Sequence, residues 1–266
     1  MTGWLTALGR RSGRADRPAP VGRIVVLPHA GGWPSAFRSW MDLVPHDVEL
    51  LAAQLPGRGP RSAEEPLRRT GPIVAALADA LAARDPLPTV VVGHSFGSVL
   101  AYELTRSLER RGAAPRLVAV SARQPPCFPS RPPYSHRLPD DELVRHVHRI
   151  GGAPDGVADV GRLLRPSLPA IRADLEALET YRRPPTGTSV PIVALCATDD
   201  PIVIAERMFL WSVETTSGFR RLSFDGGHFY LYRRPVAEVV MPTLVDALRG
   251  DPAVEPTVTQ AVASSA

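Results

Sequence analysis

Val90-Val91-Val92-Gly93-His94-Ser95-Phe96-Gly97-Ser98 is the stretch of sequence that decides the fold. It opens with a β-branched apolar run typical of a buried strand, and the residues from Val99 to Leu108 repeat apolar side chains at helical spacing. A Gly-X-Ser-X-Gly turn lies between the two. In that context the turn predicts a nucleophile elbow, in which a strained backbone lifts the Ser95 hydroxyl out of the sheet. The alternative is a glycine-rich strand-to-helix turn of another α/β protein, with Ser95 only capping the helix.

The rest of the chain alternates short apolar runs with helical patterns. Strands are predicted over residues 22–27, 48–54, 116–120, 191–195 and 219–224, and helices over residues 70–84 and 235–249. This alternation is typical of a doubly wound, mostly parallel sheet with helices on both faces. We therefore expect a single α/β domain over residues 21–250. Residues 1–20 are expected to form a flexible leader and residues 251–266 a disordered tail, because both are rich in small or polar residues without periodicity.

The segment of about residues 123–186 breaks this rhythm. Prolines cluster at its start, a helix is expected to begin at Asp140, and Leu164, Leu168, Ile171, Leu175 and Leu178 form an apolar stripe at helical steps. Because no strand pattern interrupts these helices, the segment is predicted to be a helical lid inserted in the sheet. The stripe is expected to pack on the body of the domain and partly to line a pocket.

Composition excludes several classes of protein. The chain has 266 residues and a formal net charge of +4, and all of its basic residues are arginine. We interpret the use of arginine without lysine as codon bias rather than as a nucleic-acid-binding surface, and no nucleic-acid-binding motif is present. No apolar run approaches the roughly 20 residues that span a bilayer, and no secretory signal is evident, which predicts a cytoplasmic protein without a membrane partner. Cys127 and Cys196 lie too far apart in the sequence, and too isolated, to indicate a disulfide framework or a zinc site.

Three residue types in the right order indicate nucleophilic catalysis. Ser95 comes first, an aspartate follows a late strand, and His228 lies on a glycine-flanked loop after the last predicted strand. This is the chain order of α/β-hydrolase triads, and it predicts the α/β-hydrolase fold. The histidine would remove the serine proton, and the aspartate would fix its tautomer. Asp200 is preferred for the aspartate because it precedes Pro201 at the mouth of a turn, and Asp199 and Asp225 remain alternatives.

The strand over residues 22–27 ends in Pro28-His29-Ala30-Gly31-Gly32. An early strand that ends in small residues is where hydrolases place one oxyanion donor, so the backbone amides of Ala30 and Phe96 are predicted to form the oxyanion hole. His29 is interpreted as a structural hydrogen-bonding residue. Arg58, in a Gly-Arg-Gly turn, could meet a phosphate, but it is interpreted as a solvated loop arginine.

Several motifs together resemble the type II thioesterases of polyketide and nonribosomal peptide assembly lines, a family of α/β-hydrolases. They run nearly from end to end of the chain: Leu27-Pro28-His29-Ala30-Gly31-Gly32, Gln54-Leu55-Pro56-Gly57-Arg58-Gly59, Gly93-His94-Ser95-Phe96-Gly97, residues 168–181, Thr198-Asp199-Asp200-Pro201, and Phe224-Asp225-Gly226-Gly227-His228-Phe229-Tyr230-Leu231. The resemblance implies that Ser95 is the nucleophile, Asp200 the residue that orients the base, and His228 the base. Ala30 and Phe96 would supply the oxyanion-hole amides.

The resemblance also implies a substrate and a partner. Members of the family release acyl groups from the phosphopantetheine arm of acyl or peptidyl carrier proteins, so no cofactor is expected beyond the arm that the substrate brings. The carrier proteins of these pathways are acidic, which suits the positive net charge of this chain. Two positions depart from the family pattern. Cys196-Ala197 replaces glycines before the acidic turn, and Ser121-Ala122 replaces Ser-Gly at the expected floor of the acyl pocket.

Other functions remain open at this stage. The same triad could transfer the acyl group to an amine or an alcohol, or cyclise it, instead of hydrolysing it. A general small-ester hydrolase and a non-catalytic carrier-binding protein are further alternatives, and the intact set of Ser95, Asp200 and His228 argues against the last. A standalone enzyme is expected rather than a domain of a larger synthase.

Overall fold

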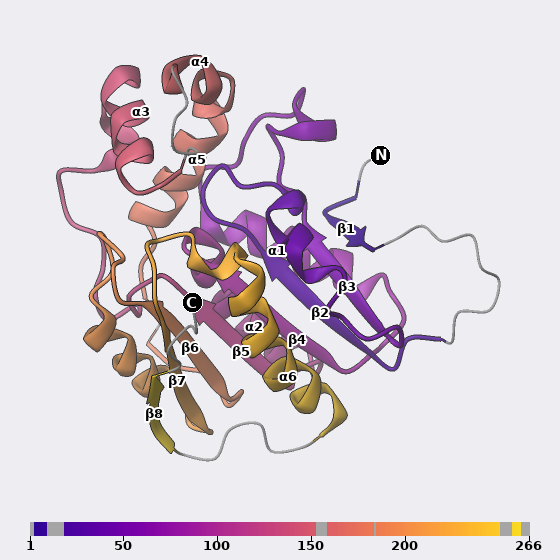
Figure 1. The fold of residues 1–266 in the computed structure, drawn as a ribbon. Helices are drawn as coiled ribbons and strands as arrows, with labels where there is room; N and C mark the ends of the chain where they lie inside the picture. Colours follow the sequence, from indigo (N-terminus) through magenta and orange to yellow (C-terminus); the bar gives the residue numbers. More distant parts are fainter. Residues whose placement is uncertain (1–2, 10–18, 153–158, 184, 251–256, 262–266) are drawn as a thin grey trace.

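An eight-stranded sheet forms the centre of the computed structural model, which describes residues 3–9, 19–152, 159–183, 185–250 and 257–261 (Figure 1). The strands lie in the order β1-β3-β2-β4-β5-β6-β7-β8, and every neighbouring pair is parallel except β1 with β3. Their bounds are β1 (Leu5–Leu8), β2 (Gly22–Leu27), β3 (Val48–Ala53), β4 (Thr89–His94), β5 (Leu117–Ser121), β6 (Ile192–Ala197), β7 (Phe219–Phe224) and β8 (Thr257–Ala261). The mostly parallel α/β sheet predicted from the sequence is thus confirmed.

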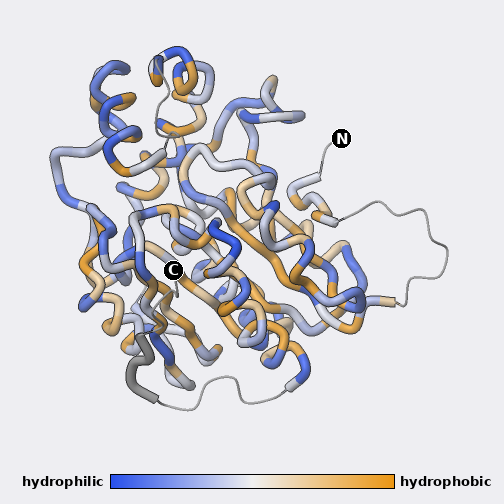
Figure 2. Tube along the Cα trace, viewed as in Figure 1, coloured by the Kyte–Doolittle hydropathy of each residue, from blue (hydrophilic) through white to orange (hydrophobic). Residues whose placement is uncertain are grey.

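Helices cover both faces of the sheet because successive residues of a strand point to opposite sides. In β2, Val25 and Leu27 face one buried cluster, which includes residues of α1 (Thr70–Ala82) and α2 (Phe96–Arg110). Ile24 and Val26 face the other cluster, with residues of η1 (Pro34–Trp40) and α6 (Arg234–Arg249). Figure 2 shows the apolar residues concentrated in these central strands. The near-continuous apolar runs of the sequence therefore reflect strands that are buried on both faces.

Two short strands correct the expected termini. Leu5–Leu8, within the predicted leader, form β1 and pair antiparallel with β3. Thr257–Ala261, within the predicted tail, form β8 and pair parallel with β7. The remaining predicted leader residues 10–18 and tail residues 251–256 and 262–266 lie outside the described part of the chain. An edge strand depends on a partner far away in the sequence, which local periodicity does not reveal.

The turn between β4 and α2 has the strained geometry that the sequence predicted. Ser95 has φ 54° and ψ −115°, outside the conformations that residues with a Cβ prefer. A Cβ on Gly97 would lie 2.0 Å from the carbonyl oxygen of Leu27, and a Cβ on Gly93 would lie 2.0 Å from the carbonyl oxygen of Gly97. The two glycines therefore allow the N-terminus of α2 to press against β2 and β4.

A helical segment separates β5 from β6, as predicted for about residues 123–186. It contains η3 (Ser135–Arg137), α3 (Asp140–Arg149), α4 (Val160–Leu164), η4 (Arg165–Ser167) and α5 (Leu168–Glu179), and no strand within its described residues. Its residues 153–158 and 184 lie outside the described part. α3 and α4 lie at one end of the molecule, away from the sheet, and α5 leads from them to the body of the domain, where Ala177 and Leu178 join the buried cluster (Figure 1). We call this segment the lid.

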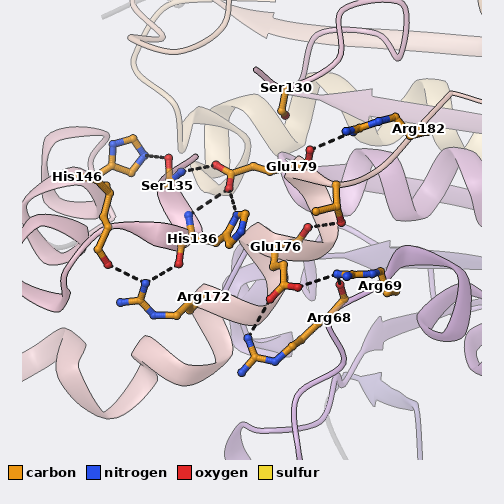
Figure 3. A network of polar contacts seen from close by, with 12 residues as sticks. Arg68, Arg69, Ser130, Ser135, His136, His146, Arg172, Glu176, Glu179 and Arg182 are labelled. Carbon is orange, nitrogen blue, oxygen red and sulfur yellow. Dashed lines mark hydrogen bonds and ion pairs between the residues drawn. The ribbon is translucent and has the colours of Figure 1, made fainter. Parts of the chain in front are cut away.

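Carboxylates of α5 fasten the lid (Figure 3). Glu179 accepts hydrogen bonds from the backbone amides of Ser135, at 2.8 Å, and His136, at 3.1 Å, and also binds the His136 ring. Glu176 accepts hydrogen bonds from two arginines that directly precede α1, Arg68 and Arg69. The first set holds α5 to the preceding lid turn, and the second holds it to the body of the domain.

The described part of the chain also contains the helical segments η2 (Gly59–Arg61), η5 (Ala205–Glu214) and η6 (Tyr230–Tyr232). None of the helices in the described part of the chain has both the length and the apolar character that a bilayer crossing requires.

Replacing Gly97 should test how closely α2 approaches the sheet. Gly97→Ala is expected to lower the free energy of unfolding by about 3 kcal/mol or more, because the new Cβ meets backbone that cannot move aside. Gly71→Ala is the matched control, since nothing lies within 4 Å of a Cβ built at Gly71 in α1. It should stabilise the protein by up to about 1 kcal/mol. Urea unfolding measures both, and equal effects would contradict the close approach.

Candidate active site

Ser95, His228 and Asp200 form one hydrogen-bonded row. The Oγ of Ser95 lies 3.0 Å from Nε2 of His228, and Nδ1 of His228 lies 2.7 Å from Oδ2 of Asp200. The side chains of His228 and Asp200 are 1% and 0% exposed, whereas Ser95 is partly accessible. The row therefore runs from a buried carboxylate to a hydroxyl that a substrate can reach. The structure brings together the three residues that the sequence proposed as a triad.

Asp200 is the aspartate whose carboxylate meets His228. Its Oδ1 accepts hydrogen bonds from the backbone amides of Ile202, at 2.9 Å, and Val203, at 3.1 Å, which leaves Oδ2 for the ring. Asp199 and Asp225 are exposed, and their hydrogen bonds go to Thr198 and Arg233 rather than to His228. The replacement of glycines by Cys196-Ala197 does not keep Asp200 from its position, because both residues continue β6.

The two predicted oxyanion donors follow neighbouring strands. Ala30 follows the end of β2, and Phe96 is the first residue of α2, after β4. β2 and β4 pair directly, with Leu27 opposite Gly93. β3 pairs with the other edge of β2, so the order of the strands reverses direction between β3 and β4. Such a switch point opens a crevice beyond the strand ends. Within the described residues, neither amide donates a hydrogen bond to another protein group. Both are free to bind an oxygen.

Arg58 is not the solvated loop residue that the sequence suggested. Its side chain is 3% exposed and binds Asp174 of α5, which is 1% exposed, through two parallel hydrogen bonds of 2.6 and 2.9 Å. Oδ2 of Asp174 also accepts the backbone amide of Gly31 at 2.7 Å. One buried carboxylate therefore joins the lid, the turn that follows β3, and the loop that carries Ala30. No phosphate is needed to explain this arginine, because its fork is already occupied.

Sequence reasoning missed Asp174, although a signal was present. Asp174 follows Ile171 by three residues and precedes Leu178 by four, so it lies on the apolar face of its helix. A carboxylate on a face that is otherwise apolar needs a buried partner. Because the Gly-Arg-Gly turn contains an arginine without a partner nearby in the sequence, Arg58 could have been proposed as the partner of Asp174.

Two further histidines lie beside His228 and are held neutral by burial. Nδ1 of His29 lies 2.7 Å from the hydroxyl of Tyr232, which agrees with its predicted structural role. Nδ1 of His94 lies 2.9 Å from Oγ of Ser121. Burial, and then the nearby charge of His228, lowers the pKa of His29 to about 3 and brings the pKa of His94 well below its usual value. Neither ring is suited to take a proton at neutral pH.

A cavity of about 730 Å³ opens in front of the row. Ser95, His228 and Ala30 lie in its wall, and the lid contributes Leu164, Ile171, Leu175 and Leu178 from the predicted apolar stripe. Three arginines and no carboxylate belong to its described lining. Ala122 lies in the wall with φ 51°, where the family pattern has glycine. This positive φ is strained for a residue that carries a Cβ.

Metal ligation is not evident among the described side chains. They contain no group of three or more His, Cys, Asp or Glu placed to hold an ion. Cys127 is exposed and Cys196 is buried, and both are free thiols.

Comparison with known proteins gives a consistent result. Residues 22–244 match the family model "Thioesterase domain". A probable cadicidin biosynthesis thioesterase of Streptomyces griseus is 35% identical over 86% of this chain and 63% of its own length, so the chain spans less than two thirds of that relative. Thioesterase PikA5 of Streptomyces venezuelae is 36% identical over 82% of this chain and 79% of its own length. The solved structure of the type II thioesterase BorB, from the borrelidin biosynthetic cluster, superposes with a TM-score of 0.81 at 34% identity and covers 92% of this chain and 98% of its own.

The Arg58–Asp174 pair gives a test of the buried contact. Arg58→Met should lower the free energy of unfolding by about 3–5 kcal/mol, because the Asp174 carboxylate stays buried without its partner. The double variant Arg58→Met/Asp174→Met should be less destabilised than the single one, since it removes both charges. Arg84→Met, which loses a half-exposed pair with Glu49, is the control and should cost less than about 1 kcal/mol. A double variant as unstable as the single one, measured by urea unfolding, would contradict this account.

His29 predicts a pH dependence of stability. Its pKa of about 3 in the folded protein lies below the value of 6.5 for a free ring, so below pH 6.5 the unfolded chain binds a proton that the folded chain does not. Stability should therefore fall as the pH drops from 6.5 towards 3. The variant His29→Gln should lose about 2 kcal/mol less than wild type between pH 7 and pH 5. Urea unfolding at the two pH values measures this, and an unchanged difference would reject the assignment.

Proposed function

The chain belongs to the thioesterase family, and we propose that it hydrolyses acyl groups from the phosphopantetheine arm of acyl or peptidyl carrier proteins through an acyl-Ser95 intermediate. The observation that carries this proposal is the row from Ser95 through His228 to Asp200, which ends in a cavity beside two free amides. The relatives named above are biosynthesis thioesterases, which supports a thioester as the substrate.

Acylation begins at the Ser95 hydroxyl. Nε2 of His228 takes the proton of Oγ while Oγ attacks the thioester carbonyl carbon, and the positive ring that forms is stabilised by the Asp200 carboxylate on Nδ1. The carbonyl oxygen becomes negative and is bound by the amides of Ala30 and Phe96. Because Phe96 opens α2, the positive end of the helix dipole adds to this stabilisation.

The C–S bond then breaks, and the thiol leaves with the proton that His228 held. In hydrolysis, water replaces Ser95 as the nucleophile, and Ser95 becomes the leaving group. His228 takes a proton from water as the water oxygen attacks the acyl-Ser95 carbonyl, and it returns the proton to Ser95 as the acid departs. Thiolates are good leaving groups, so the rate of the reaction depends mainly on the oxyanion hole and on the access of water to the acyl-enzyme. No cofactor takes part in this scheme, because the phosphopantetheine arm arrives with the substrate.

The cavity suits an acyl chain at the end of a long arm. The part of its wall that comes from α4 and α5 consists of the apolar side chains of Leu164, Ile171, Leu175 and Leu178, and such a wall accepts hydrocarbon in exchange for water. The positive net charge of +4 suits an acidic carrier protein. Transfer of the acyl group to an amine or an alcohol would use the same row, so the acceptor has to be measured.

Release of free acid from propionyl-pantetheine and from a propionyl-loaded carrier protein tests the proposal. Wild type should release acid from both, faster from the carrier, whereas Ser95→Ala should release it at the background rate. An acyl-Ser95 adduct that persists in water and is resolved only by an added amine or alcohol would overturn hydrolysis in favour of acyl transfer. Carrier binding without any turnover would instead indicate a non-catalytic protein.

Neighbouring aspartates provide a matched test of the base. Asp200→Asn should lower kcat by about 10³- to 10⁴-fold, because the ring loses the carboxylate that fixes its tautomer and stabilises its charge. Asp199→Asn, at the exposed adjacent position, should keep kcat within about twofold of wild type. The comparison uses steady-state hydrolysis of propionyl-pantetheine. A large loss from Asp199→Asn with little from Asp200→Asn would refute the assignment.

A further inference from the structure

The exposed part of the cavity wall comes from only two segments of the described chain. Of the lining residues, those that are exposed are Cys127, Pro129, Arg131, Ile202 and Arg207. We take these residues as the mouth of the cavity, because each of them is both exposed and part of the wall. We call residues 127–131 and 202–209 the rim.

The two rim segments contact each other. The guanidinium of Arg207 lies over the ring of Phe128, 4.9 Å from its centre, and donates a weak hydrogen bond to Gln124. One side of the mouth is therefore a continuous surface rather than two separate loops.

Apolar side chains gather on and next to the rim. Eight large hydrophobic residues are exposed in the described part of the chain, and four of them lie within 12 consecutive positions: Ile202, Ile204, Phe209 and Val213. Each is between 44% and 56% exposed. Ile202 lies in the cavity wall and the other three follow it within the same segment. Single exposed apolar residues are ordinary, but several of them in one segment next to a cavity wall are typical of an interaction site.

The charges of this region are mainly positive. The cavity wall and the rim carry Arg123, Arg131 and Arg207, against one exposed carboxylate, Glu206. A surface with apolar centres and basic groups is complementary to a partner with apolar and acidic groups. Under the proposed function, the arm of the substrate must pass this mouth, while the folded body of the carrier is too large to follow and must rest outside it.

We propose that the rim, together with Val213, is the surface on which an acidic carrier protein docks while its arm reaches Ser95. The inference rests on the proposed function, since only a carrier-bound substrate brings a folded partner to the mouth. Ile202, Ile204 and Phe209 bury apolar area against the carrier, and Arg131 and Arg207 face its carboxylates.

Kinetics on two substrates test this surface. Ile204→Glu and Phe209→Glu should each lower kcat/KM for a propionyl-loaded acyl carrier protein by tenfold or more, mainly through KM, because they remove apolar contact and repel the acidic partner. Both should keep wild-type kcat/KM for propionyl-pantetheine, which has no protein to dock. Val239→Glu, an exposed residue of α6, is the matched control and should change neither.

The possible results separate the two proposals. Equal losses on both substrates, or no loss on the carrier substrate, would overturn the docking surface while leaving hydrolysis intact. Absence of hydrolysis in wild type on both substrates would overturn the proposed function itself. Salt gives a second readout: KM for the carrier should rise with ionic strength in wild type and rise less steeply in Arg207→Gln. Parallel salt dependence in the two proteins would count against Arg207 as a docking residue.

Discussion

The close approach of α2 to β2 and β4 is the constraint on which the rest of the site depends. There is no space for a Cβ at Gly93 or Gly97, and the backbone between them is held at an unusual conformation, with φ 54° at Ser95. The strain is offset by the packing of an entire helix against the sheet. As a consequence, one tight turn places the hydroxyl of Ser95 in the cavity wall and leaves the backbone amide of Phe96 directly beside it in the chain.

A buried ion pair connects the lid to the loop that carries Ala30. Asp174 accepts two hydrogen bonds from Arg58 and one from the amide of Gly31, the residue that follows Ala30. The packing here is also tight, since a Cβ on Gly31 would lie 2.3 Å from Ile171 of α5. Desolvating two charges is costly, and apolar residues of the same size could stabilise the fold as well. They could not, however, define the direction of the Gly31 amide, because only a hydrogen-bond acceptor does so.

The three histidines of the site differ in the groups that surround their ring nitrogens. His94 is fully buried and His29 is partly buried, each with its Nδ1 against a hydroxyl group, and desolvation keeps their pKa values low. His228 alone has a carboxylate on one ring nitrogen and an accessible hydroxyl on the other. The cavity beyond it is apolar along α4 and α5 and carries arginines elsewhere in its wall, so a single opening combines a place for hydrocarbon with groups that attract acidic side chains.

Local patterns in the sequence determined the central strands, the turn at Ser95, the order of the triad residues and the helical lid. Buried strands and helices produce apolar patterns, and strand-to-helix turns produce short motifs, within about 20 neighbouring residues. These features can therefore be derived from composition and spacing. The sequence favoured Asp200 over Asp199, but only the tertiary structure shows which carboxylate contacts His228, and the amides of Ile202 and Val203 hold its other oxygen. The strands β1 and β8 and the Arg58–Asp174 pair were decided by tertiary structure alone. A strand edge or a buried charge depends on partners that are 37 to 116 residues away in the chain. The local sequence around an arginine is the same whether water or a carboxylate meets its guanidinium.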